Sequence, residues 1–222
     1  MKKWGVIVTL LYAVLVMVLL FPVMTLLTLS TTPTSSDYIE FLRSWGMWLI
    51  CGIFVLSQFS LLSLTVDTSQ KRTQSRTPIV RTALITGVFL AAVIVLVVLC
   101  VLLVVMGEDK TLDVSSLVRL LVMFGVLWLV WGVLFYLLYR NSPDPVTQCV
   151  SWLFRGSVLE LLVAVPSHVI VRRRHDCCAP GVTAFGITSG IALMLMAFGP
   201  SVLLLFKKRM KRYLQQGSGA RG

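Results

Sequence analysis

The side chains that could do chemistry gather in one stretch of the 222-residue chain, between residues 155 and 181. An otherwise apolar run carries Glu160 and His168, and the polar segment after it carries His175, Cys177 and Cys178. Ionisable groups inside a membrane cost about 2.5–3.5 kcal/mol each on insertion scales, so they persist mainly where they pair, line a cavity or function. Glu160 and His168 are therefore the candidates for a polar pocket.

The surroundings of Glu160 on a helix leave two interpretations open. Gly156, Glu160 and Ala164 share one helical face, which predicts a groove of small residues around the carboxyl group. We favour a structural interpretation, in which Glu160 pairs with an arginine or lysine of another helix or meets headgroups, over the binding of a proton, ion or substrate. His168 lies on nearly the same face beyond Pro166, which we expect to kink the helix, and we favour a hydrogen-bonded structural role for it.

The segment containing His175, Cys177 and Cys178 combines an imidazole with two adjacent thiols. Thiolate and imidazole groups bind soft or borderline metal ions such as zinc, copper(I) or mercury(II), so these three residues form a candidate metal site. Two cysteines followed by the Pro-Gly pair at 180–181 resemble the vicinal thiol pair of mercuric-ion transport proteins, over four or five residues. The alternatives are thiols that pack a tight loop, which we favour, and disulfide chemistry. The chain has no Cys-x-x-Cys, which argues against a thiol oxidoreductase.

Basic residues are concentrated at the ends of the apolar runs and give the chain a formal net charge of +11. This distribution is typical of membrane topology and of contact with anionic headgroups, and it is weak evidence for nucleic-acid binding. The partners we expect are membrane lipids and no nucleic acid. The side chains predicted to contact lipid headgroups are Arg172, Arg173, Arg174, Lys207 and Lys208.

The polar groups above lie within or beside long apolar runs. Of the whole chain, 57% is hydrophobic and only 13% is charged. A run of about 18 or more apolar residues is typical of a membrane helix, since roughly 20 residues cross the hydrocarbon core. The sequence therefore predicts an all-α integral membrane protein, a polytopic helical bundle in one transmembrane domain over 1–213, followed by a disordered tail over 214–222. Five runs qualify on length, and a sixth is more polar. The five are 4–29, 45–66, 83–106, 117–139 and 182–206, and the sixth is 146–171.

The number of crossings depends on the polar run at 146–171. With a cytoplasmic N-terminus, the basic connector at 71–81 falls inside and the two acidic connectors fall outside. Basic clusters at 172–174 and 207–212 flank the last run on both sides, so one crossing cannot place both inside. We favour six crossings, with 146–171 spanning. The alternatives are five crossings with this run on the membrane surface, or a final hairpin bent at 199–200.

Composition also predicts which segments contact lipid, the membrane interface or another helix. The run at 83–106 is the least polar, so we expect lipid on most of its sides. Tyr136 and Tyr139 are suited to an aromatic belt at the membrane interface. Gly186 and Gly190 have the small-residue spacing that lets two membrane helices approach closely.

Two function classes remain. The first is a non-enzymatic subunit or scaffold of a membrane assembly, either a homo-oligomer or a complex with partner membrane proteins. The second is a small transporter or soft-metal-binding membrane protein that uses the segment from Glu160 to Cys178. The chain lacks a Walker A loop, a dinucleotide glycine fingerprint, an HExxH motif and a GxSxG motif, so a membrane-embedded enzyme ranks third.

Overall fold

The computed structural model is built from helices throughout the part of the chain that it describes. That part comprises residues 2–23, 45–66, 76–107, 114–140, 145–174 and 178–219, together with positions 39, 43 and 142. The helices are α1 (Lys2–Val18) with the π-helical turn η1 (Leu19–Val23), α4 (Trp45–Val66), α5 (Arg76–Met106), α7 (Val114–Arg140), α8 (Pro145–Arg173) and α9 (Ala179–Gly219). No strand occurs within these ranges, and the all-α prediction is confirmed.

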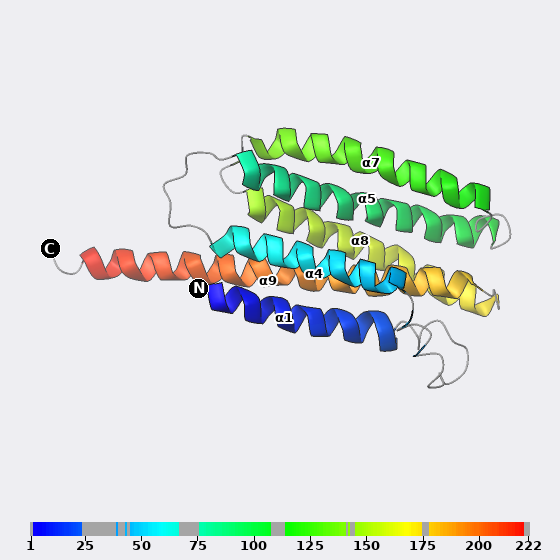
Figure 1. Ribbon diagram of the computed structural model, residues 1–222, viewed down its shortest axis with the longest axis horizontal. Coiled ribbons are helices and arrows are strands. Elements are labelled where there is room, and N and C mark those ends of the chain that lie inside the picture. The colour runs from blue at the N-terminus through cyan, green and yellow to red at the C-terminus, as the bar shows by residue number, and fades with distance from the viewer. Residues whose placement is uncertain are drawn as a thin grey trace.

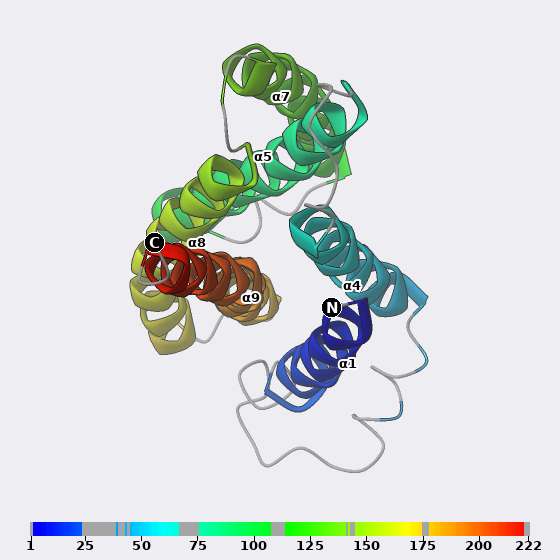
Figure 2. The same ribbon diagram turned by 90° about the vertical axis from the view of Figure 1, so that its left-hand side faces the viewer.

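The helices lie side by side, and consecutive ones run in opposite directions (Figure 1). Viewed from one end, α7, α5, α8 and α9 follow one another, with the α1–α4 pair beside them (Figure 2). The most extensive contacts join α8 to α9 and α5 to both α7 and α8, while α1 and α4 reach the other helices mainly through α9. Helix α9 is therefore the element that links the two parts of the bundle.

Helix bounds follow the apolar runs closely in the middle of the chain and less closely at its ends. Helix α4 covers the predicted 45–66, whereas α5 begins at Arg76, before the apolar run that starts at residue 83. Helix α9 continues to Gly219 through the stretch 214–219, which the sequence assigned to a disordered tail. Lysine, arginine, glutamine and leucine are good helix formers, so leaving the apolar run does not end a helix.

The first predicted run, 4–29, is described only as far as Val23. Pro22, within this run, lies in the π-helical turn η1. Proline has no N–H to donate to the preceding turn, and a π-turn is a usual way for a helix to accommodate such a break. Residues 24–29 lie outside the described part.

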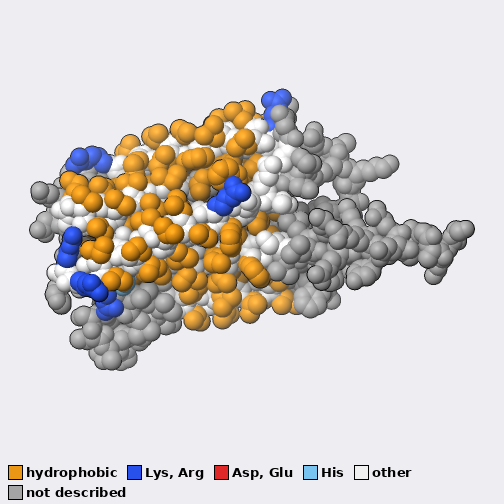
Figure 3. Space-filling model, turned by 180° about the vertical axis from the view of Figure 1, so that it is seen from behind, with side chains coloured by type: hydrophobic (Ala, Val, Ile, Leu, Met, Phe, Trp, Pro, Cys, Tyr) orange, Lys and Arg blue, Asp and Glu red, His pale blue; other side chains and the backbone are white. Residues whose placement is uncertain are grey.

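Four helical spans are long and apolar enough to cross a membrane by length and composition: Ile79–Met106, Val118–Arg140, Pro145–Arg173 and Ala179–Ser201. Two shorter apolar stretches are Val6–Phe21 and Met47–Ser63. Hydrophobic side chains cover the middle of the face shown in Figure 3, with lysine and arginine side chains mostly toward its ends. An exposed apolar surface of this extent is typical of a protein whose solvent is lipid. The chain therefore has helices of the length and composition of a helical membrane protein.

Helix α5, which the sequence predicted to face lipid on most sides, lies instead between α7 and α8. In its apolar span 39% of the residues are buried, whereas in that of α7 only 6% are. A helix that is apolar on every side carries no signal of which side meets protein, so composition alone does not predict the central position of α5.

Helix α7 packs on α5 from Leu120, which lies against the cluster containing Leu99 and Leu103, to Tyr139. A Cβ atom at Gly87 of α5 would lie 3.0 Å from the backbone nitrogen of Gly132, so the two helices meet there backbone to backbone. Nearby, Tyr139 is fully buried and its hydroxyl donates to Thr86 Oγ1 at 3.2 Å. Tyr139 therefore stabilises the bundle interior, and of the predicted aromatic belt only Tyr136 remains half-buried.

Candidate functional site

Glu160 and its partner lie at the middle of the α8–α9 hairpin. Glu160 is near the midpoint of α8, and Ser189 is near the midpoint of the apolar part of α9, Ala179–Ser201. Because the two helices are antiparallel and joined by a short connection, their midpoints meet. This contact is the part of the hairpin farthest from water at either end.

The carboxyl group of Glu160 is bonded through one oxygen only. Ser189 Oγ donates to Oε1 at 2.7 Å, and the side chain is 1% exposed. Oε2 has no hydrogen-bond partner within the described part of the chain. The predicted pairing with a basic residue is wrong for the described residues, where a serine hydroxyl takes that place. Arg155, the nearest cation along the helix, is exposed and lies over the ring of Trp152 at 5.8 Å, because a long side chain can direct its charge outward.

Small residues allow α8 and α9 to close around this contact. A Cβ atom at Gly190 would lie 3.0 Å from Leu161 Cγ, and one at Gly186 would lie 3.2 Å from Ala164 Cβ. Gly156 and Ala164 are buried on the same side of α8 as Glu160. The small-residue groove predicted from the sequence is therefore present, and it brings the backbone of α9 close to the carboxyl group.

His168 is held by a separate hydrogen bond on the same interface. The side chain is 6% exposed, and its Nδ1 lies 2.9 Å from Thr183 Oγ1. The Thr183 hydroxyl donates to the carbonyls of Ala179 and Pro180, each at 3.1 Å. In the tautomer in which Nδ1 donates to this hydroxyl, Nε2 is an acceptor. His168 is hydrogen-bonded, as predicted, and its structural role stays a prediction.

The two halves of the predicted polar pocket do not share one space. Eight positions of helix separate Glu160 from His168, which is about 12 Å along the axis. Each is bonded to its own hydroxyl on α9, Glu160 to Ser189 and His168 to Thr183. His168 Nε2, like Glu160 Oε2, has no partner among the described residues.

The predicted metal site falls mostly outside the described residues. His175 and Cys177 lie in the undescribed segment 175–177, so the metal site stays a prediction. Cys178 is exposed and directly precedes α9, and its carbonyl accepts a hydrogen bond from the Gly181 nitrogen at 3.0 Å. No group of three or more metal-ligating side chains occurs in the part of the chain that the structure describes.

The three arginines predicted to contact headgroups, Arg172, Arg173 and Arg174, are exposed at the end of α8. Arg174 Nη1 donates to the carbonyl of Val104 at 2.7 Å. This bond satisfies a carbonyl at the C-terminal end of α5, where helices lack intrahelical partners. Arg174 therefore joins two helix ends in addition to any contact with lipid.

Lys207 and Lys208 belong to the C-terminal part of α9. This part projects beyond the ends of the other helices (Figure 1). The side chains of both lysines lie outside the described residues, so their predicted contact with headgroups stays a prediction.

Ser189 and Thr183, the partners of the two polar groups on α8, were not singled out from the sequence. A signal for Ser189 was present, because it lies between Gly186 and Gly190, the positions predicted to bring two helices together. A hydroxyl next to such a close approach is well placed to bond across the interface. Thr183 carried no comparable signal.

The chain matches no protein-family model, and no curated protein or solved structure was found to be similar to it. The class defined by the fold and the site is a helical membrane protein with a buried carboxyl group between its two most closely packed helices.

Proposed function

We propose that the protein is a six-pass membrane protein that acts as a non-enzymatic subunit of a membrane assembly, in which a helix of a partner protein packs on α7. The observation that carries this proposal is the poor coverage of α7 by the rest of the bundle. Only 6% of its apolar span is buried, against 39% for α5, 39% for α8 and 56% for α9.

The packing of α8 supports six crossings. Helix α8, the polar run whose placement decides the count, lies alongside α5 and α9 over its length (Figure 1). A helix on the membrane surface would cross the ends of the others instead. Together with η1, α1 reaches from Lys2 to Val23, and α4 has 22 residues, so each is long enough for roughly 30 Å of hydrocarbon.

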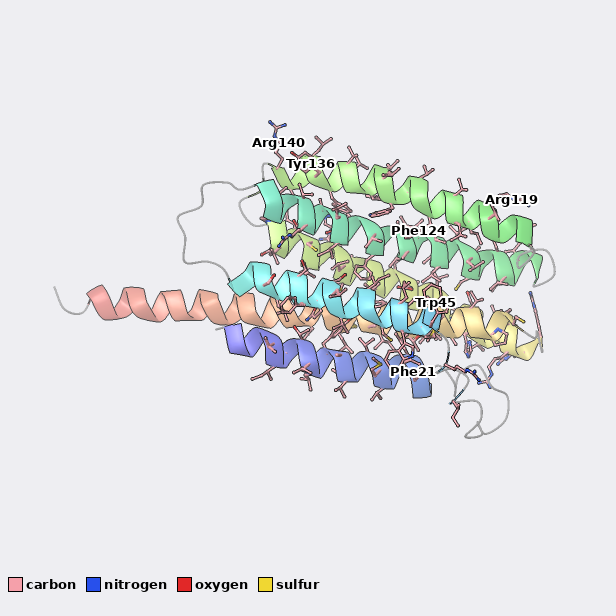
Figure 4. The ribbon with its side chains drawn as sticks, viewed as in Figure 1. Phe21, Trp45, Arg119, Phe124, Tyr136 and Arg140 are labelled. Atoms are coloured by element: carbon pink, nitrogen blue, oxygen red, sulfur yellow. The ribbon has the colours of Figure 1, made fainter. Side chains whose placement is uncertain are left out.

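The ends of α7 support the same arrangement. Arg119 lies near one end of the helix, and Arg140 points away from the bundle at the other (Figure 4). The 21 positions between them correspond to about 32 Å of helix, close to the hydrocarbon thickness of a bilayer. A lipid-exposed helix with a cation at each edge of its apolar span fits a crossing.

The distribution of charge supports a cytoplasmic N-terminus. The start of α1, the end of α4, the start of α5 and the projecting part of α9 share one end of the bundle (Figure 1). Lys2, the basic residues Arg76 and Arg81 at the start of α5 and the cluster at 207–212 thus belong to the same end, as the positive-inside rule requires of a cytoplasmic side. The cluster at 172–174 belongs to the opposite end, and it is the exception to this pattern.

The proposed docking surface is formed by the exposed side chains of α7 between Val118 and Val130, such as Leu121, Val122 and Leu129. No described side chain from Val118 to Val130 is buried. Gly125 has nothing within 4 Å of the position of a Cβ atom, so α7 has open space beside it there. A bare glycine beside large apolar side chains such as Trp128 is typical of a contact between membrane helices.

The assembly role is tested by placing a large side chain on this surface of α7. We expect the protein extracted in mild detergent to have a native mass well above that of one chain, and Gly125→Leu to reduce it. Gly52→Leu is the matched control, because Gly52 also has nothing within 4 Å of its Cβ position but lies on α4. A wild-type mass of a single chain, or equal effects of the two variants, would refute the proposal.

The arrangement of the polar groups supports the assembly role over the alternative of a small transporter or a soft-metal-binding protein. That alternative needs Glu160, His168, His175, Cys177 and Cys178 around one pocket, and His175 and Cys177 lie outside the described residues. Glu160 and His168 have separate partners, and Cys178 is exposed at the beginning of α9.

A further inference from the structure

The free oxygen of Glu160 is unusual for a group so deeply buried. Oε1 accepts a hydrogen bond from Ser189 at 2.7 Å, whereas Oε2 has no partner in the described part of the chain, with the side chain 1% exposed. About 90% or more of buried polar groups are hydrogen-bonded, and leaving one unpaired costs about 1–3 kcal/mol. A proton bound to Oε2 would remove the larger cost of burying the negative charge.

No positive charge is bonded to this carboxyl group from the described residues. Helix α9 has no titratable side chain from Ala179 to Ser201. Among the buried titratable side chains of the helices packed around this region are Cys100 of α5, Cys51 of α4, Tyr12 of α1, and Cys149 and His168 of α8, which also carries Arg155. Arg155 is directed outward over Trp152, and His168 is bonded to Thr183. An ionised Glu160 would thus be an uncompensated charge in a low-dielectric interior.

The surroundings fit a proton better than a metal ion. Calcium takes 6–8 oxygen ligands and magnesium requires near-octahedral coordination. Here the Ser189 hydroxyl is the one side-chain group bonded to Glu160 among the described residues. A proton needs only one lone pair, which Oε2 offers. The close approach of Gly186 and Gly190 to α8 leaves little room for a larger cation.

We propose that Glu160 is a proton-binding site near the middle of the membrane. A proton from water adds to Oε2 and converts the carboxylate to a carboxylic acid, while Oε1 remains the carbonyl oxygen bonded to Ser189. Release of that proton to water restores the carboxylate. The neutral form fits the closed α8–α9 interface, and the ionised form must recruit water or separate the helices. Proton occupancy is therefore coupled to the packing of this hairpin.

Infrared difference spectroscopy of the protein in lipid membranes tests the site, because a carboxylic acid has a carbonyl stretching band that a carboxylate lacks. We expect such a band to appear as the pH is lowered, to vanish reversibly as it is raised, and to be lost in Glu160→Gln. Ser189→Ala should move the band to higher wavenumber, since its carbonyl oxygen loses a hydrogen bond. Ser157→Ala is the matched control and should leave the band in place, because Ser157 donates to Phe154 of its own helix.

Several results would overturn the proposal. One is a spectrum of Glu160→Gln that equals the wild-type spectrum, and another is a Glu160 band that persists at every pH at which the protein stays folded. Loss of the band on adding sodium at constant pH would replace the proton by a metal cation. If Glu160→Gln does not fold, the spectra of Ser189→Ala and Ser157→Ala test the proposal instead. Equal band positions in these two variants would refute it.

Discussion

Replacing Gly87 by alanine should weaken the contact between α5 and α7. The new Cβ atom would lie 3.0 Å from the backbone nitrogen and 3.1 Å from the Cα atom of Gly132, where ordinary contacts are 3.4–4 Å. Backbone atoms cannot rotate away as a side chain can, so the helices must separate by several tenths of an ångström. Overpacking of this kind costs about 1–3 kcal/mol. Alanine offsets part of that through its better helix propensity, by about 1 kcal/mol at most.

Gly125→Ala is the control for this prediction, because the same change on α7 meets nothing within 4 Å. The assay is equilibrium unfolding in mixed micelles with increasing sodium dodecyl sulfate, followed by tryptophan fluorescence. Trp131 stacks on Phe135 beside this contact and reports on it. We expect Gly87→Ala to unfold at a lower detergent fraction than Gly125→Ala. An equal or higher midpoint for Gly87→Ala would refute the inference that the backbones of α5 and α7 meet at this point.

Two further substitutions probe other contacts in the same unfolding assay. Gly199→Ala would place a Cβ atom 2.5 Å from Gln58 Nε2, so we expect destabilisation that Gln58→Ala relieves, and purely additive effects of the two changes would contradict this contact. Tyr139→Phe removes the hydrogen bond to Thr86 and should lower the free energy of unfolding by about 0.5–1.5 kcal/mol. Tyr136→Phe should change it by much less, and equal losses would show that the hydroxyl of Tyr139 contributes no specific bond.

The sequence was sufficient to predict the helical membrane class, because hydrocarbon forces the backbone of a crossing segment to bond within itself. The observed bounds of α4 agree with the predicted 45–66, because an apolar segment that crosses hydrocarbon must be helical over its length. The sequence did not indicate which helices lie next to one another in the bundle. Helix α5 is apolar on every side, and its central position depends on Gly87 and Thr86, whose partners lie far away in the chain.

The candidate site was predicted in part for a related reason. The cost of burying a charge marks Glu160 as unusual whatever surrounds it, and its spacing from Gly156 and Ala164 indicates a groove. Its partner was predicted to be a cation, whereas Ser189 fills that place. Helical periodicity shows which residues share a face, but it does not show which helix that face meets. His168 was predicted to be hydrogen-bonded, and its bond to Thr183 depends on how α8 and α9 align.

The most direct test of the six-pass architecture is side-specific labelling of single cysteines. Cys178 is kept in a background without the other cysteines, and Gln74→Cys and Gln215→Cys are made separately in the cysteine-free chain. A membrane-impermeant thiol reagent is then applied to intact cells and to inside-out vesicles. We predict that positions 74 and 215 react only from the cytoplasmic side and that Cys178 reacts only from the opposite side. Labelling of Cys178 from the same side as position 74 would contradict a spanning α8 and with it the six-crossing architecture.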